Sequence, residues 1–203
     1  IAIMWRGAML RGLARGRDFD LDMIDYYSDG LDELKRHRGL TALVADIPPD
    51  ALARPGQPGR IDHFERTLRE LRGNGVSIHM IDHHAVTAEP RGRFEGYVRA
   101  GLLESVDLSP FDLDEDQRTP VDKKQCAAER VRTFLESRFA MPPDGVINRL
   151  ALFAHDQDLG IRVIPDATRI SAIIGSDYNP ISLAGMLAKG EFWSDHLEGV
   201  YRE

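Results

Sequence analysis

The chain has 203 residues, of which 42% are hydrophobic and 29% are charged, and this composition is typical of a globular protein with one full core. Its 33 acidic and 26 basic residues give a net charge of −7, which disfavours broad electrostatic capture of long nucleic acids. No apolar run approaches the roughly 20 residues of a membrane span, and no signal sequence is recognisable, so we expect a cytoplasmic protein with no membrane partner. The single cysteine, Cys126, excludes an internal disulfide framework and a zinc site built from several cysteines.

The first predicted elements precede residue 40. The stretch 1–16 has the apolar spacing of an amphipathic helix, and Gly16 is its predicted stop. The alternating acids of "DLDMIDYY" (20–27) fit a half-exposed strand, and a short helix is predicted to begin near Asp29.

Two strands with a helix between them are predicted over residues 40 to 82. "LTALVAD" (40–46) and "VSIHMID" (76–82) are apolar runs that each end on an aspartate, and "RIDHFERTLRELRGNG" (60–75) has one apolar stripe closed by glycines. Strands that alternate with helices predict an α/β fold with a doubly wound parallel sheet flanked by helices. Because ligands bind beyond the carboxyl ends of such strands, Asp46 and Asp82 should face one crevice.

The rest of the chain is predicted to be irregular at first and then helical. Residues 87–120 lose periodicity and contain proline, glycine and acids, which indicates a long surface excursion. Helices are then predicted over 122–139 and 144–160, the second with Asp144 as its N-cap. Three further helical segments lie near 166–175, 180–189 and 193–202.

Carboxylates and imidazoles recur at the ends of these elements. Asp46 follows one strand, "DHH" (Asp82, His83 and His84) follows the next, and Asp156 follows an apolar helix. Oxygen ligands with some nitrogen suit divalent cations such as Mn²⁺, and two such ions can clamp a phosphoryl group and activate water. The pattern therefore predicts a metal centre that acts on phosphate esters.

These motifs resemble the DHH phosphoesterase superfamily, which is named for the Asp-His-His triplet found here at residues 82–84. "LVADIPP" is similar to the family's second motif, "KKQCAAERVRTFL" to the helix that follows its third, and "LALFAHDQDLG" to its fourth. The resemblance covers essentially the whole chain. It implies a DHH domain over 1–190 and a linker helix over 191–203 that leads toward a second domain.

The resemblance also implies a role for each matching residue. Asp46, His83 and Asp156 would be metal ligands, with Asp46 bridging two Mn²⁺ ions; Mg²⁺ is the alternative metal. Asp82 would orient the histidines, and His84 would contact the substrate phosphate or the reacting water. Asp158 is the alternative to Asp156 at the fourth motif.

One family motif, of the form His-x-Asp-x-Asp-Gly, is absent from the sequence. In the family it precedes a helix that "IAIMWRGAML" resembles, so we expect the motif upstream of Ile1. In a protein that includes this motif, the resemblance implies hydrolysis of phosphodiester bonds in short oligonucleotides or dinucleotides; residues 1–203 alone would lack half of the metal site and could be inactive. The alternatives are an inorganic pyrophosphatase of the same superfamily and a degenerate, non-catalytic nucleotide-binding or regulatory domain.

Several of these residues also have a structural interpretation. Asp156 fits a turn or a helix C-terminus, and His155 fits a neighbour of the site better than a ligand. His79 lies within a strand and fits a partly buried structural histidine. Cys126 lies on a helical face among alanines, which favours core packing over nucleophilic catalysis.

Overall fold

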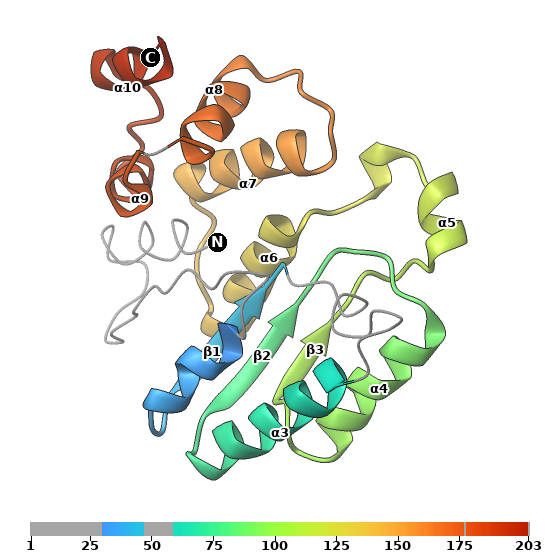
Figure 1. Cartoon of the computed structure of the whole chain (residues 1–203). Helices are drawn as coiled ribbons and strands as arrows, with labels where there is room; N and C mark the ends of the chain where they lie inside the picture. The colour runs from blue at the N-terminus through green and yellow to red at the C-terminus, as the bar shows by residue number, and fades with distance from the viewer. Residues whose placement is uncertain (1–29, 47–58, 177, 203) are drawn as a thin grey trace. The chain divides into compact units, whose positions relative to one another are not determined.

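The computed structural model describes residues 30–46, 59–176 and 178–202, and these form two compact units (Figure 1). The described residues up to Pro120 form the first, which we call the sheet unit, and those from Val121 onward form the second, the helical unit. The helix predicted over 1–16, the strand over 20–27 and the proline-rich segment after Asp46 lie outside the described residues.

The sheet unit is a mixed α/β structure built on three parallel strands in the order β1-β2-β3. β1 pairs with β2 from Thr41↔Ser77 to Ala45↔Ile81, and β2 pairs with β3 from His79↔Ser105 to Ile81↔Asp107. The elements of this unit are η1 (Gly30–Arg36), β1 (Thr41–Ala45), α3 (Gly59–Gly73), β2 (Ser77–Ile81), α4 (Ala88–Arg99), β3 (Ser105–Asp107) and α5 (Leu113–Arg118).

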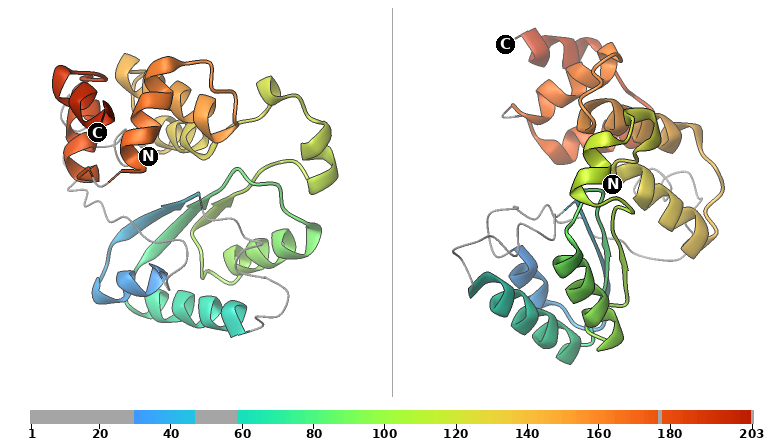
Figure 2. Two further views of the ribbon diagram at one scale, coloured as in Figure 1. Left: turned by 45° about the horizontal axis from the view of Figure 1, so that its top comes forward. Right: turned by 90° about the vertical axis from the view of Figure 1, so that its right-hand side faces the viewer.

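Side-chain alternation along the strands separates a hydrophobic face of the sheet from a more polar one. Ile78 and Met80 belong to the core cluster shared with Leu68 of α3 and Phe94 of α4. Figure 2 shows α3 and α4 on the same face of the sheet. The predicted α/β class with a parallel sheet flanked by helices is therefore confirmed, whereas double winding, which needs helices on both faces, stays a prediction.

His79 lies on the other face of β2. Its side chain is buried, and its Nδ1 lies 2.7 Å from the Oγ of Ser105 on β3. A histidine paired across two strands in this way is a structural polar group, as the sequence predicts.

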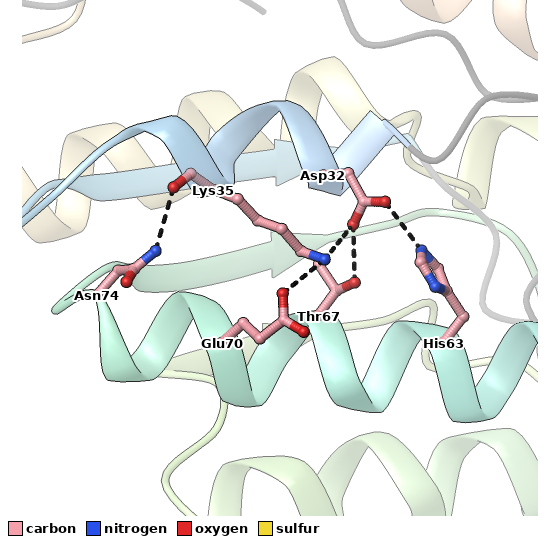
Figure 3. A network of polar contacts seen from close by, with 6 residues as sticks. All are labelled: Asp32, Lys35, His63, Thr67, Glu70 and Asn74. Carbon is pink, nitrogen blue, oxygen red and sulfur yellow. Dashed lines mark hydrogen bonds and ion pairs between the residues drawn. The ribbon is translucent and has the colours of Figure 1, made fainter.

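A polar network joins η1 to α3 (Figure 3). The Asp32 carboxylate accepts a hydrogen bond from Thr67 Oγ1 at 2.9 Å and lies 3.1 Å from His63 Nε2. Lys35 Nζ lies 2.8 Å from Asp32 and 2.7 Å from Glu70. These contacts hold the segment that precedes β1 against the helix that follows it.

The prediction of an irregular excursion over 87–120 is wrong. This stretch contains α4, β3 and α5, so it completes the sheet and covers it. α4 tolerates Pro90 because proline in the first turn removes no intrahelical hydrogen bond. α5 begins with a capping box between Asp112 and Glu115, which stabilises a short acidic helix that has no apolar stripe.

The helical unit agrees with the predicted helices. Asp144 is the N-cap of α7, and its Oδ1 accepts hydrogen bonds from the backbone N–H groups of Val146 and Ile147. Leu197, in the segment predicted as a linker, is fully buried in a core cluster with residues of α8 and α9. The α-helices of this unit are α6 (Ala127–Phe139), α7 (Gly145–Asp158), α8 (Pro165–Ile174), α9 (Pro180–Ala188) and α10 (Asp195–Arg202).

Within the described ranges of both units, none of the helices is long and apolar enough to cross a membrane.

Candidate metal centre

The carboxyl ends of β1 and β2 bring two aspartates to one edge of the sheet. Asp46 directly follows β1, and its backbone N–H donates to the carbonyl of Ile81 at 3.0 Å. Asp82 directly follows β2, and its N–H donates to the carbonyl of Asp107 at 2.8 Å. Because both backbones continue the pairing of the parallel ladder, both side chains are placed at the same end, as the sequence predicts.

Asp46 has a left-handed backbone with φ of 65°. This region is unfavourable for residues with a Cβ, although aspartate and asparagine tolerate it better than most. The turn separates the strand from the segment that follows and presents the Asp46 carboxylate to His83.

Asp82 is the buried member of the site, with 1% of its surface exposed. One of its oxygens accepts the backbone N–H of His84 at 3.0 Å, and the other lies 3.0 Å from His84 Nδ1. A carboxylate only accepts hydrogen bonds, so the Nδ1 of His84 carries the proton in this contact. Asp82 therefore fixes both the backbone and the ring of His84, and its role in orienting His83 stays a prediction.

His83 pairs with Asp46 across the two strand ends. Its Nδ1 lies 3.3 Å from Asp46 Oδ1, and its ring centroid lies 4.2 Å from that of His84. The contact with His83 lowers the pKa of the Asp46 carboxyl; burial opposes this shift, and the charges of His83 and His84 add to it. Asp46 is therefore held in its anionic form, which is the form that binds a cation.

The four side chains together can hold a metal ion. One ligand atom from each of Asp46, Asp82, His83 and His84 lies within 4.8 Å of the other three. Two carboxylates and two imidazoles form a mixed oxygen and nitrogen donor set, which suits first-row divalent metals. The residues present therefore fit a divalent metal ion, and the donor set does not distinguish Mn²⁺ from its neighbours in the series.

Asp156 belongs to the helical unit, and its prediction as a metal ligand stays a prediction. Its carboxylate is 2% exposed and accepts hydrogen bonds from the backbone N–H groups of Val163 at 2.8 Å and Ile164 at 3.3 Å. The side chain of Gln157 donates a third at 2.8 Å. These contacts match the structural interpretation of this residue, an acid that stabilises a turn after a helix.

Glu129 is a polar residue whose role sequence reasoning missed. It forms a capping box with Cys126 at the start of α6, and its Oε2 also lies 2.7 Å from His155 Nδ1. The spacing Cys-Ala-Ala-Glu before an apolar helix is the signal that indicates the capping box. The buried Cys126 thiol has a pKa raised to about 12, chiefly by burial, which agrees with core packing rather than nucleophilic catalysis.

Searches of protein-family models, curated proteins and solved structures found no match to this chain.

Proposed function

We propose that this protein is a DHH-type, divalent-metal-dependent phosphoesterase that hydrolyses phosphodiester bonds in short oligonucleotides or dinucleotides. The observation that carries the proposal is the convergence of Asp46, Asp82, His83 and His84 at one edge of a parallel sheet. Asp46 follows β1, and the triplet Asp82, His83 and His84 follows β2, in the order that the resemblance implies. The preferred metal in this proposal is Mn²⁺.

Each side chain would then contribute through contacts that it makes in the sheet unit. Asp46 and His83, which face each other at 3.3 Å, would bind the metal. Asp82 would hold His84 by two hydrogen bonds, so that the His84 ring has a fixed orientation toward a phosphate oxygen. A divalent cation bound there would lower the pKa of a bound water and neutralise charge on the phosphate.

The burial of the four residues favours a centre that is open to a substrate. Asp82 is buried, whereas the side chains of Asp46 and His84 are 49% and 44% exposed. The His83 side chain is 10% exposed. Two half-exposed side chains beside buried ones leave room for the water and substrate that a reactive metal centre must accept.

The test measures metal binding and hydrolysis with the same set of variants. Calorimetry with Mn²⁺ and hydrolysis of a dinucleotide, a short oligonucleotide and pyrophosphate are measured for the full-length protein, with the residues upstream of Ile1, and for its variants Asp46→Asn and His83→Gln. Asparagine tolerates the left-handed backbone of residue 46, so Asp46→Asn removes the charge without altering the turn. We expect each variant to lower metal affinity and phosphodiester hydrolysis by more than about 100-fold, beyond the loss typical of an outer-shell residue.

Matched controls use the same substitutions away from the centre. Asp62→Asn on α3 and His37→Gln after η1 should leave metal binding and hydrolysis unchanged. Hydrolysis that survives Asp46→Asn would contradict the proposal. Metal binding without hydrolysis of any substrate would favour the non-catalytic alternative, and cleavage of pyrophosphate alone would favour the pyrophosphatase.

A further inference from the structure

We propose that Arg91 of α4 is a substrate-binding residue, whose guanidinium holds a second phosphate group of the substrate beside the phosphate that is hydrolysed. The inference rests on the proposed function and concerns only residues of the sheet unit. The resemblance assigns no role to this arginine or to any other residue of α4.

Within the residues that the structure describes, Arg91 differs from the other arginines of α4 in having no acidic partner. The residue four positions before it is Thr87, which carries no charge, whereas the other arginines each pair with a glutamate at that spacing, as Arg93–Glu89 and Arg99–Glu95. Arg91 is half-buried and lies in the first turn of the helix, where the helix dipole disfavours a cation. The stability of α4 therefore does not explain this charge.

Two backbone carbonyls orient the Arg91 guanidinium. Its Nη2 donates to the carbonyl of Ser109 at 2.6 Å and, more weakly, to that of Phe111 at 3.4 Å. The Oγ of Ser109 accepts the backbone N–H of Phe111 at 3.3 Å, so both acceptors belong to one turn. The Nε and Nη1 groups of Arg91 have no acceptor in the described ranges and are not buried. They can therefore donate to an anion.

The sheet places this guanidinium beside the candidate metal centre. Asp82 donates its backbone N–H to the carbonyl of Asp107, the last residue of β3, and Ser109 follows two residues later. Because two residues span at most about 7 Å, the Arg91 guanidinium lies within about 13 Å of the Asp82 backbone.

The order of the strands separates Arg91 from the metal ligands themselves. The proposed ligands follow β1 and β2, whereas the carbonyls that hold Arg91 follow β3. Neighbouring strands lie about 4.8 Å apart, so Arg91 lies to one side of the centre. It is positioned for a phosphate next to the one that the metal would bind.

A substrate with two phosphate groups is the ligand class that fits this arrangement. Arginine stays charged at neutral pH, and its planar N–H groups match the oxygens of a phosphate. Oligonucleotides and dinucleotides with a terminal phosphate carry a second phosphate group, whereas a dinucleotide without one has only the scissile group. Arg91 therefore favours the first two kinds of substrate.

The test compares the affinities of three dinucleotides: one without a terminal phosphate, one with a 5′-phosphate and one with a 3′-phosphate. In all three an uncharged methylphosphonate replaces the scissile phosphodiester, so that none is hydrolysed. Binding to the full-length protein with Mn²⁺ is measured by calorimetry. We expect one of the terminal phosphates to raise the affinity by about 10-fold or more, because hydrogen bonds between charged groups are strong.

Substitutions on α4 assign this gain in affinity to one side chain. Arg91→Gln should abolish the gain, and Arg91→Lys, which keeps the charge, should retain part of it. Arg93→Gln removes the same charge two residues away and is the matched control, which should keep the whole gain. A gain that survives Arg91→Gln, or that is absent from the parent protein, overturns the inference.

Hydrolysis of unmodified dinucleotides by the parent protein separates this inference from the proposed function. If they are hydrolysed and the gain does not depend on Arg91, the inference is wrong and the proposed function stands. If the gain depends on Arg91 but no phosphodiester is hydrolysed, Arg91 binds phosphate and the proposed function fails. If the parent protein neither binds nor hydrolyses a dinucleotide, both are wrong.

Discussion

Aspartates at the ends of helices and strands contact different groups in the two units. In the sheet unit, the backbone N–H groups of Asp46 and Asp82 donate to carbonyls of neighbouring strands. Both side chains contact imidazole rings, and Asp82 also accepts the backbone N–H of His84. In the helical unit, the carboxylates of Asp144 and Asp156 accept backbone N–H groups of a helix start and of a turn.

This difference arises because strands and helices pair their terminal backbone N–H groups in different ways. A parallel ladder pairs backbone groups up to the end of a strand, so carboxylates there are available for chemistry. A helix leaves its first four N–H groups unpaired, and turns leave others, so nearby carboxylates are used to accept them. An acid at the end of an element is therefore a stronger functional signal after a strand than beside a helix.

The largest expected effect tests whether the two units are energetically separate. Leu68→Ala in the sheet unit and Leu197→Ala in the helical unit each remove a fully buried side chain and should cost about 2 to 5 kcal/mol. Hydrogen exchange read by mass spectrometry should show lost protection chiefly in the mutated unit. The exposed Leu152→Ala is the control, and equal loss in both units for either core variant would contradict independent stability.

Asp156→Ala tests whether the Asp156 carboxylate stabilises the turn that follows α7 in the helical unit. It leaves two backbone N–H groups without their acceptor, which should lower the free energy of unfolding by about 3 kcal/mol. Urea denaturation measures this loss, with the exposed Asp62→Ala as the matched control. A variant as stable as the parent chain would show that the turn does not depend on Asp156.

Asp82→Asn tests whether the Asp82 carboxylate supports metal binding in the sheet unit. Asparagine preserves the shape of the side chain but loses the charge that holds the His84 ring, so affinity for Mn²⁺ should fall about 10- to 100-fold. Calorimetry measures the change, and Asp62→Asn is the control. Unchanged affinity would mean that Asp82 contributes nothing to metal binding.

The smallest expected effect is the pH dependence of stability that Asp32 contributes through the polar network in Figure 3. Burial raises the pKa of Asp32, but hydrogen bonds from Lys35 and Thr67 outweigh it, and the net pKa lies below the ordinary value of 3.8. The stabilisation is therefore present above pH 3.8 and is lost as the pH falls through the lowered pKa. Because the Asp32 side chain is 34% exposed, we expect only a shallow dependence.

Thermal melting between pH 5 and pH 2 measures this dependence. The difference in melting temperature between the parent chain and Asp32→Asn should shrink as the solution becomes more acidic. A difference that grows with acidity would contradict the sign of the effect.

Most of the sheet unit's centre could be predicted because its signals are local. Asp46 and Asp82 each end an apolar run, and parallel strands that end together bring such residues to one edge. The regular structure after residue 87 could not be predicted from composition, because Pro90 and the short acidic α5 resemble a loop. Phe94 and Tyr97 do carry the buried spacing of α4, whereas α5 depends on its capping box.

The sequence does not decide between the two interpretations of Asp156, a metal ligand and an acid that stabilises a turn. Its partners are backbone N–H groups of Val163 and Ile164, which every residue except proline possesses, so no side chain in the sequence indicates the contact. The pairing of Glu129 with His155 likewise joins residues on different helices and depends on how α6 and α7 pack.

The left-handed turn at Asp46 limits which amino acids that position can accept. Glycine and asparagine would adopt the same backbone, but neither carries a charge; glutamate carries the charge, but it adopts this backbone less readily. In a library randomised at codon 46, selection for folding alone should recover glycine, asparagine and aspartate. Selection for metal-dependent activity should recover aspartate alone, so the two outcomes would separate the backbone requirement from the chemical one.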